Sequence, residues 1–311
     1  MPTAYFSAII KLIQPVPRLC APHCSPLCHQ LPITLNFKPM KNTIKYIIPL
    51  LIAATLSACE KAIDLKLKDS TPQYVVEGVL TNEAGGCKVL LSKTKNFTDN
   101  NNFNGIGGAT VTIADETNTY TLSPTSAGIY QNNTLTGTPG HTYKLNVSVD
   151  GKTFTSTCTM LPAVKLDSIY LVKDELINNK DGTPRKYVTA QYHDPAGVKN
   201  YYRFVQYVNG RKEETIMLED DEFTDGQDVN NNLRFSNDND NPARDIRPGN
   251  EVTIEMFSID QAVYKYFYSL SNSANGDGNN AAPANPMTNI KGGALGYFSA
   301  HTVERKKLTA P

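Results

Sequence analysis

The sequence has no excess charge, because 30 Lys and Arg residues balance 30 Asp and Glu residues over 311 positions. A balanced surface exerts no long-range attraction on nucleic acid, so no nucleic-acid partner is expected. Tryptophan is absent, and 16 Tyr and 11 Phe supply the aromatic side chains. This aromatic content, together with frequent Thr and Asn, favours strands and turns over helices. No run of 18 apolar residues occurs, so we expect no membrane-spanning helix.

The motifs of common enzymes are also missing. No Gly-x-Ser-x-Gly, P-loop or dinucleotide fingerprint occurs. His141, His193 and His301 each stand alone, without the closely spaced partners that a zinc site needs. His193 precedes Asp194 and Pro195, a sequence more typical of a turn than of a catalytic dyad. We therefore predict that the protein is not an enzyme, and that it has no catalytic residues, no metal and no cofactor other than a covalent lipid.

A lipoprotein signal is the most specific pattern in the sequence. Lys41 and Lys45 supply a positive start, an apolar run follows over residues 46–55, and residues 56–59 read Leu-Ser-Ala-Cys. This order and spacing predict a cleavable signal peptide. The ending resembles the lipobox of bacterial lipoproteins, which implies that the Cys59 thiol carries a diacylglycerol and that Cys59 begins the mature chain. The alternative is a buried strand or helix that happens to end in Cys.

The signal peptide is thus assigned to residues 40–58. Residues 1–39 precede it, and a lipoprotein signal works only near the N-terminus of a chain. We therefore interpret residues 1–39 as an upstream extension, with Met40 as the true initiator. The alternative is that this extension binds a metal through its closely spaced cysteines Cys20, Cys24 and Cys28.

A β-sandwich is predicted over residues 73–162, after a lipidated, charged tether at 59–72. Apolar runs bounded by turns predict strands, and alternating apolar and polar residues, clearest at 109–114 and 141–149, indicate half-buried ones. We expect strands at 74–80, 88–92, 109–114, 119–122, 128–130, 141–149 and 152–158. Asp150 and Gly151 stand between the last two, and this pair is typical of a tight hairpin whose residues need positive φ. The number and spacing of the strands favour a sandwich of immunoglobulin or transthyretin type.

A second domain is predicted over residues 163–303. It has strands and one amphipathic helix near 259–272, and a frayed charged tail follows it from Glu304 onward. Ser258 is expected to cap the helix. The predicted fold class is therefore mainly β: an N-terminal immunoglobulin/transthyretin-like sandwich followed by a β-rich domain with one helix.

Cys87 and Cys158 are the cysteines that follow Cys59, and both lie in predicted strands. Outside the inner membrane the environment is oxidising, which permits a disulfide between them. Two separate buried thiols are equally compatible with strands. Both alternatives remain open, because the sequence does not show whether the two strands are adjacent.

Two acidic segments are candidates for calcium binding. Oxygen ligands suit calcium, and the first segment supplies them as Asp220, Asp221, Asp225 and Asp228. The second segment is Asn-rich and contains Asp238, Asp240 and Asp245. Neither segment matches the Asp-x-Asp-x-Asp-Gly loop, and solvated acidic loops are the alternative.

Tyrosines are the candidate ligand platform, with Tyr202 and Tyr264 as its principal members. Aromatic rings can stack on sugars while their hydroxyl groups form hydrogen bonds. The wider set comprises Tyr201, Tyr202, Tyr207, Tyr264, Tyr266 and Tyr268. The alternative is that these tyrosines are half-buried packing residues of strands and helix.

The segments 74–78, 108–113, 128–130 and 140–145, together with the closing segment 289–298, resemble the domain-of-unknown-function 4249 family. The resemblance extends over residues 74–302, and the closing segment is its most specific part. It implies an outer-membrane lipoprotein that acts as a non-enzymatic accessory or binding partner of a TonB-dependent transporter. It implies no reaction and no catalytic residue. A surface carbohydrate-binding module or adhesin is the alternative function, and a glycoside hydrolase is a third.

Overall fold

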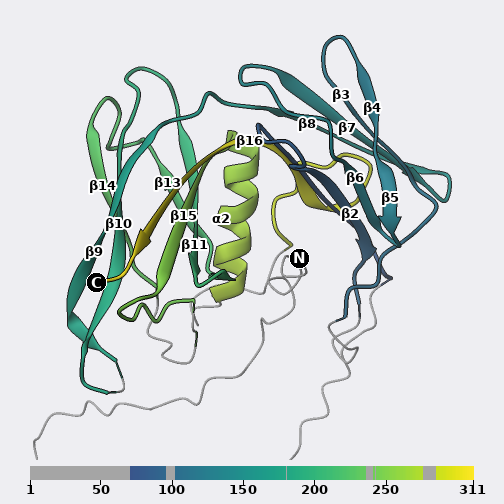
Figure 1. Cartoon of the computed structure of the whole chain (residues 1–311). Helices are drawn as coiled ribbons and strands as arrows, with labels where there is room; N and C mark the ends of the chain where they lie inside the picture. The colour runs from purple at the N-terminus through teal and green to yellow at the C-terminus, as the bar shows by residue number, and fades with distance from the viewer. Residues whose placement is uncertain (1–70, 96–101, 180, 236–240, 242, 276–284) are drawn as a thin grey trace, which may run out of the picture. The chain divides into compact units, whose positions relative to one another are not determined.

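A computed structural model of the protein describes residues 71–95, 102–179, 181–235, 241, 243–275 and 285–311 (Figure 1). The predicted extension, the signal peptide and Cys59 lie outside these residues. Over the described ranges, strands form three sheets and are accompanied by one helix. The prediction of a mainly β protein is confirmed.

The largest sheet has nine strands. Eight of them are neighbours in the order β12 (Arg211–Lys212), β11 (Tyr201–Val208), β15 (Glu251–Ser258), β16 (Leu295–Thr309), β1 (Tyr74–Thr81), β2 (Cys87–Lys93), β6 (Ile129–Asn132) and β5 (Ser123–Ser126). The ninth, β13 (Met217–Asp220), also pairs with β11. This sheet therefore contains both the first and the last strand of the described chain.

Two smaller antiparallel sheets complete the β-structure. One has four strands in the order β4 (Thr119–Thr121), β3 (Thr110–Ala114), β7 (Thr142–Val149) and β8 (Lys152–Thr159). The other has three strands in the order β14 (Asp228–Leu233), β10 (Pro184–His193) and β9 (Leu166–Asn178). Asp150 and Gly151, between β7 and β8, both have positive φ, as predicted for this hairpin.

The first hydrophobic core lies between the four-stranded sheet and the β1–β2–β6 part of the large sheet. Alternate residues are buried along these strands, including Val76, Val111, Leu145 and Phe154, each no more than 2% exposed. Full burial of one such side chain stabilises the fold by about 1.5–3 kcal/mol. Period-two alternation thus produces the sandwich that the sequence predicts.

The second core lies on the same face of the large sheet, toward its β11 end. Tyr202, Phe204 and Val208 of β11 point into it and pack with residues such as Val188 of β10. The intervening residues of β11, including Tyr201, point to the opposite face, where the helix α2 (Gln261–Asn275) packs. β11 therefore separates two different environments.

The helix confirms the prediction near 259–272, but the predicted cap is wrong. Asp260 caps α2, since its Oδ1 accepts a hydrogen bond from the Val263 N–H at 2.9 Å. Ser258 is instead the last residue of β15, and its hydroxyl accepts from the Val164 N–H at 3.4 Å. Continued pairing of β15 with β16 keeps Ser258 extended.

The predicted frayed tail is also wrong, because β16 continues to Thr309. Residues 302–309 pair with β15 in antiparallel register. Arg305 lies opposite Glu255 and forms an ion pair with it at 2.7 Å. Lys307 lies opposite Thr253 and forms a diagonal ion pair with Glu251 at 3.0 Å. Charge in this segment therefore reflects a solvated strand face with cross-strand pairs rather than disorder.

β16 joins the two predicted domains in one sheet. It runs parallel to β1 over seven residue pairs and antiparallel to β15. Gly296 has a φ of 99°, and a Cβ at this position would lie 2.0 Å from the Val76 carbonyl oxygen. Gly296 of the closing segment is therefore required for close approach of β16 and β1.

Candidate functional site

The two principal tyrosines of the predicted platform lie apart. Tyr202 is fully buried on the second-core face of β11, and its hydroxyl donates a hydrogen bond to Asp194. Tyr264 is half-buried on α2, on the other face of the sheet. The structure therefore does not combine Tyr202 and Tyr264 in one surface. Parity along β11 is the signal that separates them, since adjacent strand residues point to opposite faces.

Tyr264 instead belongs to a tyrosine strip formed by Tyr201, Tyr264 and Tyr268. The Tyr201 and Tyr264 ring centroids are 4.9 Å apart, and those of Tyr264 and Tyr268 are 6.0 Å apart with an interplanar angle of 16°. Tyr264 and Tyr268 are four residues apart on α2, which places them on one helix face. Tyr268 is 54% exposed, so the strip reaches solvent.

Hydrogen bonds to neighbouring polar side chains position two of the three tyrosines in the strip. The Gln261 side-chain N–H donates to the Tyr201 hydroxyl at 2.8 Å, and the Tyr264 hydroxyl donates to Asp220 Oδ2 at 3.2 Å. Burial and the adjacent Asp220 carboxylate raise the pKa of Tyr264 to about 12. The Lys199 ammonium lies 5.9 Å from the Tyr201 ring centroid. The strip thus combines an aromatic surface with positioned hydrogen-bonding groups.

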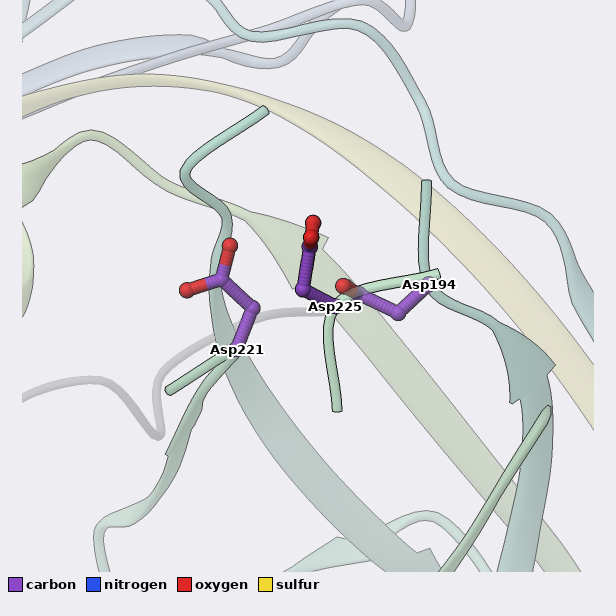
Figure 2. A group of neighbouring side chains, drawn as sticks. All are labelled: Asp194, Asp221 and Asp225. Atoms are coloured by element: carbon purple, nitrogen blue, oxygen red, sulfur yellow. The ribbon is translucent and has the colours of Figure 1, made fainter. Parts of the chain in front are cut away.

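The predicted calcium residues are only partly brought together. Asp221 and Asp225 lie with Asp194 in one group, whose offered carboxylate oxygens are within 4.8 Å of one another (Figure 2). Asp220 turns toward Tyr264, and Asp228 pairs with His193 at 2.8 Å. We name Asp194, Asp221 and Asp225 the aspartate cluster.

Asp194 follows the end of β10, Asp221 follows the end of β13, and Asp225 lies in the turn between β13 and β14. Asp221 accepts a hydrogen bond from the Asn200 N–H at 2.7 Å and forms an ion pair with Lys199. Asp225 accepts from the Gly197 N–H at 2.7 Å. Burial raises the pKa of Asp194, because desolvation disfavours the charged form, and the hydrogen bond from Tyr202 opposes this effect.

Of the aspartates in the second acidic segment, only Asp245 lies among the described residues, and it belongs to no such group. Asp238 and Asp240 lie outside the described residues. Asp245 forms an ion pair with Arg247 at 2.7 Å. Asp245 is therefore occupied in a local charge pair.

Cys87 and Cys158 are both buried and are free thiols. Of the two alternatives that the sequence leaves open, the structure has the separate thiols. Burial raises the pKa of Cys87 to about 12 and also raises the pKa of Cys158. Thiols of this kind are poorly reactive, since the thiolate is the reactive form.

Ser299 and His301 form a buried pair that no motif in the sequence indicates. The Ser299 hydroxyl lies 2.8 Å from His301 Nδ1, and both residues are at most 6% exposed. Burial, followed by the nearby Arg203 charge, lowers the pKa of His301 to about 3. The Phe257 ring packs on the imidazole with centroids 4.7 Å apart. This enclosure identifies the pair as a packing element of the sheet.

Comparison with known proteins gives a family and little else. The family model described as domain of unknown function DUF4249 matches residues 60–307. No curated protein matches the sequence. A solved structure of a candidate carbohydrate-binding protein from Bacteroides uniformis is 10% identical, with 76% of this chain and 98% of that chain covered and a TM-score of 0.19. Among the described residues, no helix combines the length and apolar character needed to cross a membrane.

Proposed function

Because the chain belongs to the DUF4249 family, whose function is unknown, we propose its role from the site: a non-enzymatic binding protein that recognises carbohydrate through the tyrosine strip. In this proposal Cys59 carries the lipid anchor, and the protein serves the outer membrane as an accessory of a TonB-dependent transporter. The observation that carries the binding role is the near-parallel pair of Tyr264 and Tyr268, with Tyr268 open to solvent.

The chemistry of the strip suits a sugar ring. The C–H face of a pyranose is apolar and packs on an aromatic face, while its hydroxyl groups need hydrogen-bonding partners at the rim. The rings of Tyr264 and Tyr268 supply the face, and the Gln261 amide and Asp220 carboxylate adjoin it. Apolar surface with a few positioned polar groups is the usual composition of a small-ligand site.

The binding role is tested by titrating the purified full chain with soluble glucans, xylans, mannans and amino-sugar polymers. We expect one of these polymers to bind, and Tyr268→Ala to weaken that binding about tenfold, the loss of one aromatic contact. Tyr170→Ala is the matched control, since Tyr170 is 40% exposed on β9. Equal affinities of wild type and Tyr268→Ala for the bound polymer would show that the tyrosine strip does not bind it.

The non-enzymatic part of the proposal has its own measurement. A glycoside hydrolase needs a pair of carboxylates that flank the scissile bond. After prolonged incubation with the bound polymer, we expect no new reducing ends. Their appearance at a rate proportional to protein concentration would favour the hydrolase alternative.

The anchor and the partner are tested in membranes. Cys59→Ser should abolish metabolic labelling with fatty acid and move the protein out of the outer-membrane fraction. Mild detergent extraction of the wild-type protein should co-purify a β-barrel transporter. Retention of Cys59→Ser in the membrane fraction contradicts the anchor, and recovery of the wild type without a barrel protein contradicts the accessory role.

A further inference from the structure

We propose that the aspartate cluster, formed by Asp194, Asp221 and Asp225, is a binding site for one calcium ion. The proposal is independent of carbohydrate binding, because none of the three aspartates belongs to the tyrosine strip. The offered carboxylate oxygens lie within 4.8 Å of one another. Calcium binds oxygen at about 2.3–2.6 Å, so two ligands on opposite sides of the ion are about 4.6–5.2 Å apart. Magnesium needs about 2.0–2.1 Å and a tighter group.

Asp194 provides a second observation, independent of the clustering, that points to a missing ligand. Its side chain is fully buried, and Tyr202 donates a hydrogen bond to Oδ1. Oδ2 has no hydrogen-bond partner within the described structure. Figure 2 shows the Asp194 side chain extending toward Asp225, with Asp225 between Asp194 and Asp221. A buried carboxylate oxygen without a partner is costly, and a cation at this position satisfies it.

The backbone around the cluster is already arranged. The N–H groups of Thr224 and Asp225 both donate to the Asp221 carbonyl oxygen, at 3.1 and 3.2 Å. The Asp194 N–H donates to the Gln227 carbonyl oxygen at 2.9 Å. The turn between β13 and β14 is thereby fixed against the end of β10. Thr224 Oγ1, in this same turn, is a further buried oxygen without a partner over the described ranges.

Lys199 is the competitor for the site. Its ammonium forms an ion pair with Asp221, and its side chain is 55% exposed, so it can leave toward solvent. The three carboxylates and one ammonium have a formal charge of minus two, which a divalent ion matches. Replacement of Lys199 therefore frees one Asp221 oxygen and increases the attraction for a cation.

Terbium luminescence gives a direct test with the full chain. Terbium substitutes for calcium and is excited through nearby aromatic rings. The chain has no tryptophan, so tyrosines are the sensitisers, and the Tyr202 hydroxyl adjoins Asp194. We expect saturable emission that is displaced by Ca²⁺ and not by an equal concentration of Mg²⁺. Wild type without saturable emission, or without displacement by Ca²⁺, overturns the proposal.

Variants locate the ion. Asp225→Asn changes an exposed residue and should weaken terbium and calcium binding at least about tenfold. Lys199→Met should strengthen binding several-fold. Asp228→Asn is the control, because the Asp228 side chain is 92% exposed and pairs with His193 outside the cluster. Ca²⁺ should raise the Tm of wild type and of Asp228→Asn, but not of Asp225→Asn. Undiminished binding by Asp225→Asn would place the ion elsewhere and sink the proposal.

Discussion

The two parts of the molecule on either side of residue 162 bury different kinds of side chain. Between Tyr74 and Met160, the buried polar residues among those described are Thr81 and Ser156, and both are uncharged. Beyond Val164 the described chain buries several ionisable residues, namely Asp174, Arg185, Asp194, Glu213, Asp221 and His301. Burial of charge costs free energy unless each group finds a partner. The second part therefore carries the specific chemistry, and the first part is built mainly from apolar packing.

β11 shows how the second part combines both roles. Tyr201 on one face contributes to the tyrosine strip. Tyr202 on the other face is buried and holds Asp194 of the aspartate cluster. Two candidate sites therefore depend on one strand. Residues on one face of β11 contribute to the first site, and residues on the other face contribute to the second.

The largest expected effect is in the apolar part. Phe154 is 2% exposed and packs on the Tyr74 ring with centroids 5.1 Å apart. Phe154→Ala should lower the free energy of unfolding by about 4 kcal/mol, because it removes buried area and leaves a cavity. Denaturant titration measures this change, with the exposed neighbour Thr153→Ala as control. A loss below about 1 kcal/mol would show that this core is not the main source of stability.

The next effect tests whether buried charge in the second part is comparably important. Glu213 is buried and accepts hydrogen bonds from Arg244 Nε at 2.7 Å and Nη2 at 2.9 Å. Glu213→Gln should lower the free energy of unfolding by about 3 kcal/mol, because Arg244 keeps its charge but loses the carboxylate that neutralises it. The control is Glu214→Gln at the exposed adjacent position, measured in the same denaturant titration. Equal stabilities of the two variants would contradict the comparison.

A third effect arises where the two parts share a sheet. Glu77 on β1 is half-buried, and desolvation raises its pKa to about 7 from its ordinary 4.5, while the Lys212 charge opposes this. The folded state thus holds this proton more tightly, so the stability it contributes is full below pH 4.5 and is lost as pH rises through 7.

As pH rises from 5 to 8, the free energy of unfolding of Glu77→Gln should therefore increase by about 2 kcal/mol relative to that of wild type. Unfolding curves at several pH values measure the difference. His301, whose pKa is lowered by burial, makes folding less stable as pH falls from 6.5 toward 3. That trend is common to both proteins and cancels in the comparison. A gap that does not change with pH would show that Glu77 ionises freely in the folded state.

The smallest effect is expected at the tyrosine strip. Tyr268 is 54% exposed, so Tyr268→Ala should change the free energy of unfolding by less than about 0.5 kcal/mol. Two positions earlier on α2, Tyr266 is 2% exposed, and Tyr266→Ala should cost about 3–5 kcal/mol. Thermal and denaturant unfolding of the pair compare them. A large loss for Tyr268→Ala would mean that the strip serves packing.

Local patterns in the sequence predict much of this fold. Strands β3 and β7 follow from alternation, β1 follows from an apolar run, and α2 follows from apolar residues at helical spacing. The continuation of β16 past Glu304 could not be predicted in this way, because its charged residues are stabilised by partners on β15. Nor does alternation show that β16 lies parallel to β1, since that pairing joins opposite ends of the chain.

The candidate sites likewise contain residues that local sequence patterns indicate and residues that they do not. The acidic segment contains Asp221 and Asp225, which the structure brings close together, but Asp194 enters the cluster from the end of β10. Its sequence neighbours His193 and Pro195 suggested only a turn. Of the two principal tyrosines predicted for the platform, Tyr264 lies in the tyrosine strip and Tyr202 is buried on the opposite face of the sheet. The parity of β11 already separates Tyr202 from Tyr201. Residues that meet only through tertiary structure leave no local pattern in the sequence. The alternation of residues along a strand is such a pattern, and it can be read directly.

The parallel pairing of β1 with β16 also determines how the fold responds to mechanical force. Any pull on the segment that precedes Thr71 enters the fold at the start of β1. This strand is hydrogen-bonded on both sides, to β2 and to β16, each over seven residue pairs. A pull along its axis loads these bonds together in shear instead of opening them one after another. The last strand of the chain therefore acts as a mechanical lock for the first.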